Sequence, residues 1–94
     1  MSLTALPGGD VIEAGLADLA NGVESVPALL VSIGRPRLAR LGFQIPNPIE
    51  DANRRLYDLL AREDQDAAHS RYNALVRRLV SYERAAGVSL ASRA

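Results

Sequence analysis

The spacing of apolar residues restricts this chain to one class of fold. From Ile12 onward they recur every three or four positions, and no stretch alternates in the manner of a strand. The most regular run steps by four, three, four, three and four residues through Ala68, Tyr72, Leu75, Leu79, Tyr82 and Ala86. A seam of this kind packs against other helices. The sequence therefore predicts an all-α protein, with the segment from 68 to 86 against its core.

Capping and helix-breaking residues divide this pattern into a small bundle of about four helices. Asp10, with Glu13 three residues later, is the expected start of the first helix, and the Asn-Gly pair at 21–22 is its expected end. Ser25 is the expected cap of the second helix. We expect that helix to be broken near Gly34–Pro36, because glycine and proline together interrupt helical structure.

The third helix has the clearest start signal in the chain. Asn47 can cap it, Pro48 fits its first position and Glu50 stands third. Ion pairs with i,i+4 spacing are expected along its exposed face, namely Glu50–Arg54, Asp51–Arg55, Arg54–Asp58 and Asp58–Arg62. A short polar turn then leads to the last helix, with Asp64 or Asp66 as cap, so we expect the last two helices to form an antiparallel pair.

Composition narrows the range of functions. We expect the 94 residues to form one domain, 1–94, with an extended leader at 1–8 and a frayed tail at 88–94. There is no cysteine and one histidine, so the sequence predicts no disulfide framework, no metal site and no cofactor. It has neither a signal-like start nor an apolar run of about 20 residues. We therefore expect a cytoplasmic, bacterial-type protein that does not enter a membrane.

The arginines of the last helix lack local partners. Arg71 and Arg78 flank the apolar seam, whereas Arg77 and Arg84 point away from it, and none has an acidic residue three or four positions away. The first helix, a second chain, a phosphate or water could each supply the counter-charge. A neighbouring face carries small residues that would let another backbone approach closely: Ala67, Ser70, Ala74, Ser81 and Ala85.

These features predict a non-enzymatic interaction or regulatory module that associates with itself or with a small protein partner, as an antitoxin or adaptor would. No nucleophile, base and orienting carboxylate stand in a catalytic arrangement. The expected interface residues are Arg71, Tyr72, Ala74, Arg78, Ser81 and Tyr82.

One alternative is an enzyme. Arg62 and His69 are separated by six residues, at the end of one expected helix and the start of the next. This spacing resembles the Arg-x(4–6)-His motif of the HEPN ribonucleases. The resemblance implies a helical bundle that acts as a dimer, with Arg62 and His69 acting on RNA phosphates at the dimer cleft. It covers these two residues and the helical character; Glu63 replaces the usual polar residue, and Tyr72 is out of register with the family's tyrosine.

A second alternative is a small DNA-binding regulator. The short helical piece after Gly34 carries Arg35, Arg37 and Arg40, an arrangement that suggests a helix-turn-helix. A formal net charge of zero argues against a large phosphate footprint, so nucleic acid is the less favoured partner.

Overall fold

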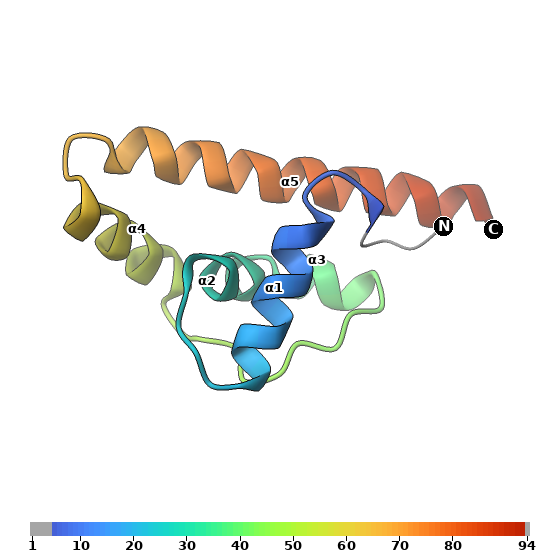
Figure 1. The fold of residues 1–94 in the computed structure, drawn as a ribbon. Coiled ribbons are helices and arrows are strands. Elements are labelled where there is room, and N and C mark those ends of the chain that lie inside the picture. Colours follow the sequence, from blue (N-terminus) through green and yellow to red (C-terminus); the bar gives the residue numbers. More distant parts are fainter. Residues whose placement is uncertain (1–4, 94) are drawn as a thin grey trace.

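The computed structural model describes residues 5–93, with side chains from 5 to 91, and every regular element in that range is a helix. Along the chain these helices are α1 (Gly9–Ala20), α2 (Val26–Ile33), α3 (Arg35–Arg40), α4 (Ala52–Glu63) and α5 (Ala68–Arg93). Figure 1 shows α5 lying along one side of the molecule, with α1, α2 and α3 beneath it and α4 joined to it by a turn at one end. The predicted all-α fold is confirmed.

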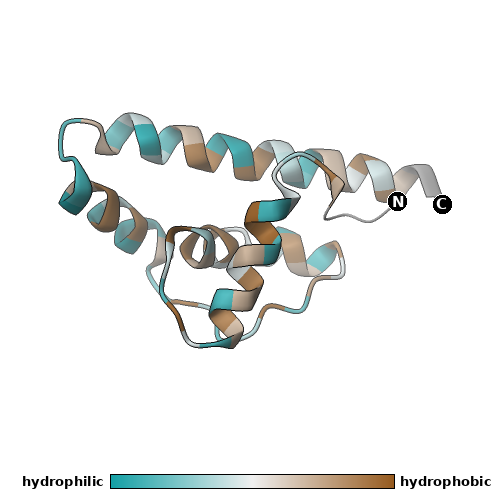
Figure 2. Cartoon of the chain, viewed as in Figure 1, coloured by the Kyte–Doolittle hydropathy of each residue, from teal (hydrophilic) through white to brown (hydrophobic). Residues whose placement is uncertain are grey.

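The core is centred on α2. Four consecutive residues of this helix, Ala28 to Val31, are at most 2% exposed, so it is covered on every side. Both α1 and α4 pack on α2. In Figure 2 the ribbon of α2 is mostly brown, the colour of hydrophobic residues, whereas α4 and α5 alternate between teal and brown. α1 approaches α2 closely at Gly15, where an added Cβ would lie 2.4 Å from the Pro27 carbonyl oxygen. Glycine is required there because no side chain fits between the two backbones.

Local signals correctly placed the C-terminal end of α1 and the start of α2. Asn21 ends α1, and Gly22 follows with a left-handed φ of 71°. The Ser25 hydroxyl accepts a hydrogen bond from the Ala28 N–H at 3.2 Å, so the predicted cap of α2 is confirmed. The prediction for Asp10 was wrong: Gly8 is the N-cap of α1, and Asp10 lies in the first turn. The break at Gly34 is complete enough to make α3 a separate helix.

The predicted start of α4 was also wrong. Asn47 has a φ of 44° and donates its amide to the Leu19 carbonyl at 3.1 Å, 28 residues away in sequence. The Ile49 N–H donates to the Ser32 hydroxyl at 3.1 Å. These contacts hold residues 47–49 against α1 and α2, so α4 begins only at Ala52. A tertiary partner has displaced the local cap.

The expected ion pairs of α4 take other partners. Arg55 reaches Glu24, 31 residues away, with an Nη2–Oε1 distance of 2.6 Å, and Arg54 lies 3.9 Å from Asp51 at i,i+3 spacing. None of the four predicted i,i+4 pairs closes within 4.0 Å in the described part of the chain. Long arginine side chains on an exposed helix readily choose the better-placed carboxylate.

The last helix packs as the seam predicted. Ala68, Leu79, Tyr82 and Ala86 are at most 5% exposed, and Tyr72 contacts Tyr57 of α4 edge-on. The chain reverses between α4 and α5 through an Asp64 turn. Beyond Ala86, α5 continues across Gly87 to Arg93.

The described part of the N-terminal leader is short. Residues 1–4 of the expected leader, like Ala94, lie outside the described residues. At 5–8 the chain turns, and the Gly9 N–H donates to the Leu6 carbonyl at 2.8 Å. None of the described helices combines the length and the apolarity needed to cross a membrane.

Candidate functional site

The structure places Arg62 and His69 in different surroundings. Arg62, in the last turn of α4, lines a concave surface with Glu24, Arg55 and their neighbours. His69 is exposed in the first turn of α5, and its Nε2 lies 3.2 Å from the Asn73 side-chain amide. No hydrogen bond or ion pair between described residues joins the two side chains.

The predicted interface residues separate into core and surface. Tyr82 is 1% exposed and Tyr72 is half-buried, so both belong to the packing of α5 within the chain. Arg71 pairs within the chain, with its Nη1 3.2 Å from Glu63 Oε2. Ala74 and Ser81 are exposed beside Arg78 on the outer side of α5.

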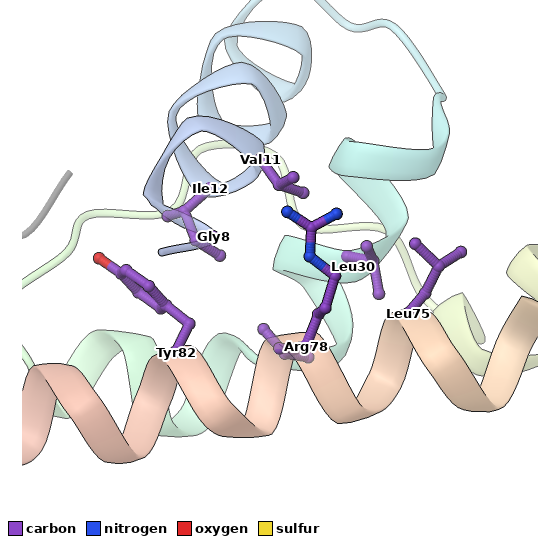
Figure 3. A pocket seen from close by; sticks show the side chains of 8 residues that line it. Gly8, Val11, Ile12, Leu30, Leu75, Arg78 and Tyr82 are labelled. Carbon is purple, nitrogen blue, oxygen red and sulfur yellow. The ribbon is translucent and has the colours of Figure 1, made fainter. Parts of the chain in front are cut away.

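Arg78 stands over an apolar gap. Figure 3 shows its side chain rising from α5 toward Val11 of α1, above a small cavity that Ile12, Leu30 and Leu75 also line. The aliphatic part of the arginine covers apolar surface while its guanidinium faces outward. Packing within the chain therefore accounts for an arginine at position 78, without a second chain or a ligand.

A second concave surface lies between α3 and the C-terminal half of α5. We name it the arginine groove, and its lining residues are Arg37, Arg40, Leu41, Glu83 and Arg84. Leu38 is fully buried and fixes α3 beneath α5, so that Arg37 and Arg40, three positions apart, share one side of the short helix. Arg35 lies away from them, in a concavity with Ile49 and Asp51. The three arginines of α3 therefore do not form one surface.

Glu83 lies at the base of the arginine groove. It is 7% exposed, its Oε1 lies 4.0 Å from Arg37 Nη1, and its Oε2 has no hydrogen-bond partner among the described residues. Gly34 leaves room for this carboxylate, since an added Cβ would lie 2.9 Å from Oε2. Burial raises the pKa of Glu83, and the nearby Arg37 charge opposes part of that rise. Oε2 is therefore a buried acceptor without a hydrogen bond, enclosed against Gly34 below the surface of the groove.

The charges of the arginine groove are unbalanced. Three guanidinium groups face one carboxylate, and neither Arg40 nor Arg84 has a carboxylate within 4.0 Å in the part of the chain that the structure describes. The concavity along α4 is closer to balance, because its three arginines face two carboxylates, Glu24 and Asp58. Arg55 makes a two-pronged contact with Glu24 that lowers the pKa of that carboxyl.

The described residues contain no cluster of three or more side chains suited to holding a metal ion. Comparison of the chain with protein-family models, curated proteins and solved structures finds no match. The candidate site therefore rests on geometry.

Sequence reasoning missed the arginine groove. Its strongest clue was Glu83, the one acidic residue between 67 and 94, directly after Tyr82 of the apolar seam. On a helix that position lies beside the seam, so a buried carboxylate could have been anticipated. The side of α5 on which α3 would pack could not be read from spacing alone.

Proposed function

We propose that this protein is a non-enzymatic interaction module that binds an acidic segment of a partner protein in the arginine groove. The observation that carries the proposal is the convergence of Arg37, Arg40 and Arg84 on one concave surface where a single carboxylate is present. A planar guanidinium binds a carboxylate through two parallel hydrogen bonds, so unpartnered arginines in a groove suit acidic side chains.

The other groups of the groove favour a protein ligand over a nucleic acid. Leu41 adds apolar surface beside the arginines, and the Glu83 carboxylate would repel a phosphate placed deep in the groove. Duplex recognition by a helix also needs an element that lies along the major groove, whereas α3 has 6 residues. A polypeptide supplies both the carboxylates for the rim and an N–H or O–H donor for Glu83.

Such a module would act as an adaptor or as an antitoxin-like regulator, in which an acidic partner surface is captured without chemistry. The Glu83 carboxylate, 4.0 Å from Arg37 Nη1, attracts that guanidinium toward the groove before a partner arrives.

A peptide-binding experiment tests the proposal. The probe is a fluorescein-labelled acidic peptide that contains one leucine, and the reference probe replaces its acids with the corresponding amides. Exposed ion pairs contribute about 0.2–1 kcal/mol each, so Arg40→Gln together with Arg84→Gln should weaken binding by about 2- to 30-fold. Added salt should weaken the wild-type binding as well.

Arg35→Gln provides the matched control, since Arg35 is an exposed arginine of the same helix that lies outside the groove. It should leave peptide affinity nearly unchanged. Equal affinity for the acidic and the amidated peptides, or an equal loss in the groove and control variants, would contradict the proposal.

A further inference from the structure

We propose that the segment which occupies the arginine groove is the acidic turn of a second copy of this chain. We define the acidic turn as residues 63–66, which read Glu-Asp-Gln-Asp. The inference rests on the proposed function, because it names the partner of the same groove. Three observations support it: charge complementarity, the distance between groove and turn, and the polar side chains of the turn that have no partner among the described residues.

The acidic turn cannot reach the groove of its own chain. It lies at the start of α5, at the opposite end of the molecule from α3 (Figure 1). Asp66 and Arg84 are 18 positions apart, nearly all of them within α5, which at 1.5 Å per residue corresponds to about 27 Å. The described molecule is elongated, with extents of 44 × 26 × 19 Å, so its acidic and basic ends are held apart. Only another copy can join them.

The acidic turn is ordered and presents its charges outward. Asp64 Oδ1 accepts hydrogen bonds from the N–H groups of Asp66 and Ala67, at 3.1 and 3.2 Å, which fixes the backbone of the turn. Asp66 is exposed, and its carboxylate makes no hydrogen bond or ion pair among the described residues. Asp66 is therefore a preorganised carboxylate for Arg40 or Arg84, and little conformational freedom is lost when it binds.

Gln65 offers a hydrogen-bond donor to Glu83 Oε1, the carboxylate oxygen that lies 4.0 Å from Arg37 Nη1. Its exposed side-chain amide stands between two acidic residues and makes no described hydrogen bond. A carboxylate accepts and an amide donates, so a turn with acids around a central amide matches arginines around a buried acceptor. This hydrogen bond would form at Oε1, whereas Oε2 remains enclosed against Gly34.

A two-fold pairing satisfies both grooves at once. If two α5 helices lie antiparallel, the turn of each copy meets the groove of the other, and the helices cross near Leu75, midway between positions 66 and 84. The acidic turn and the arginine groove of each copy would then both lie in the same interface.

Charge reversal tests this arrangement, with self-association measured by sedimentation velocity. Asp66→Arg and Arg84→Glu should each weaken the wild-type dimer at least about tenfold, since each places like charges opposite one another. An equimolar mixture of the two variants should form a 1:1 dimer of near wild-type stability. A chain that carries both changes should dimerise again, because its new cation meets the new carboxylate of the partner.

Glu13→Arg and Arg35→Glu are the controls, as both residues are exposed and lie outside the turn and the groove. They should leave the dimer intact. A monomeric wild type, or a dimer that neither reversal weakens, would overturn the inference. If the wild type is monomeric but still binds the acidic peptide, the proposed function stands and only the second copy is rejected; if it does neither, both fail.

Discussion

Replacing Gly15 by alanine should reveal how closely α1 and α2 are packed. A Cβ at this position would lie 2.4 Å from the Pro27 carbonyl oxygen and 2.5 Å from Val31 Cγ2. Both distances are far inside van der Waals contact. Val31 is completely buried and the other obstacle is backbone, so a side-chain rotation cannot make room. The two helices must move apart.

The expected cost follows from two opposing contributions. Overpacking of a core typically costs about 1–3 kcal/mol, and a gap of about 0.5–1 Å forfeits a quarter to a half of the dispersion energy of the atoms facing it. Alanine in place of a helical glycine recovers about 1 kcal/mol through its higher helix propensity. Because the clash involves backbone, we expect the steric contribution to lie at or above the top of its range. The net loss should be about 2 kcal/mol.

Gly87→Ala is the matched control. Gly87 is also inside a helix, but an added Cβ would meet no atom within 4 Å and its φ is not positive. Here only the propensity gain applies, so stability should rise by about 1 kcal/mol. In urea denaturation followed by circular dichroism, the two variants should shift the midpoint in opposite directions, and Gly15→Ala should lower Tm by about 8–16 °C. If Gly15→Ala stabilised the protein as Gly87→Ala does, the close approach of α1 to α2 would be refuted.

Two further changes test the local chemistry. Ser25→Ala removes the cap that accepts from the Ala28 N–H and the 2.6 Å bond that the hydroxyl donates to Asp18, so urea midpoints should show a loss of about 1 kcal/mol; an unchanged midpoint would argue against the cap. Glu83→Gln should be more stable than the wild type at neutral pH. The pKa of Glu83 is raised by burial in the folded state above its ordinary value of 4.5. The wild type therefore loses stability as the pH rises from 4.5 through the folded-state pKa, and the glutamine variant does not. Urea midpoints of both proteins between pH 4 and 7 should diverge over that range, whereas parallel profiles would show that burial of the carboxyl has no such effect.

The contrast between correct and incorrect predictions has a physical basis in α4. The cap assigned to Asn47 obeyed every local preference, yet the Asn47 amide bonds to Leu19 and the helix starts five residues later, at Ala52. Likewise Arg55 leaves its own helix to bind Glu24. In both cases the residue bonds to a partner about 30 residues away in place of the nearby one. The spacing of residues in the sequence does not indicate such a distant partner.

The sequence by itself determined the helical class, the buried seam of α5, the cap at Ser25 and the break at Gly34. Each depends on periodicity or hydrogen bonds within about one helical turn, where the chain fixes its own geometry. Only the tertiary structure decided where α4 begins, which carboxylate each arginine meets and that Glu83 is buried beside α3. Those outcomes depend on which faces of distant helices come together, and packing selects among these arrangements only once the whole core has formed.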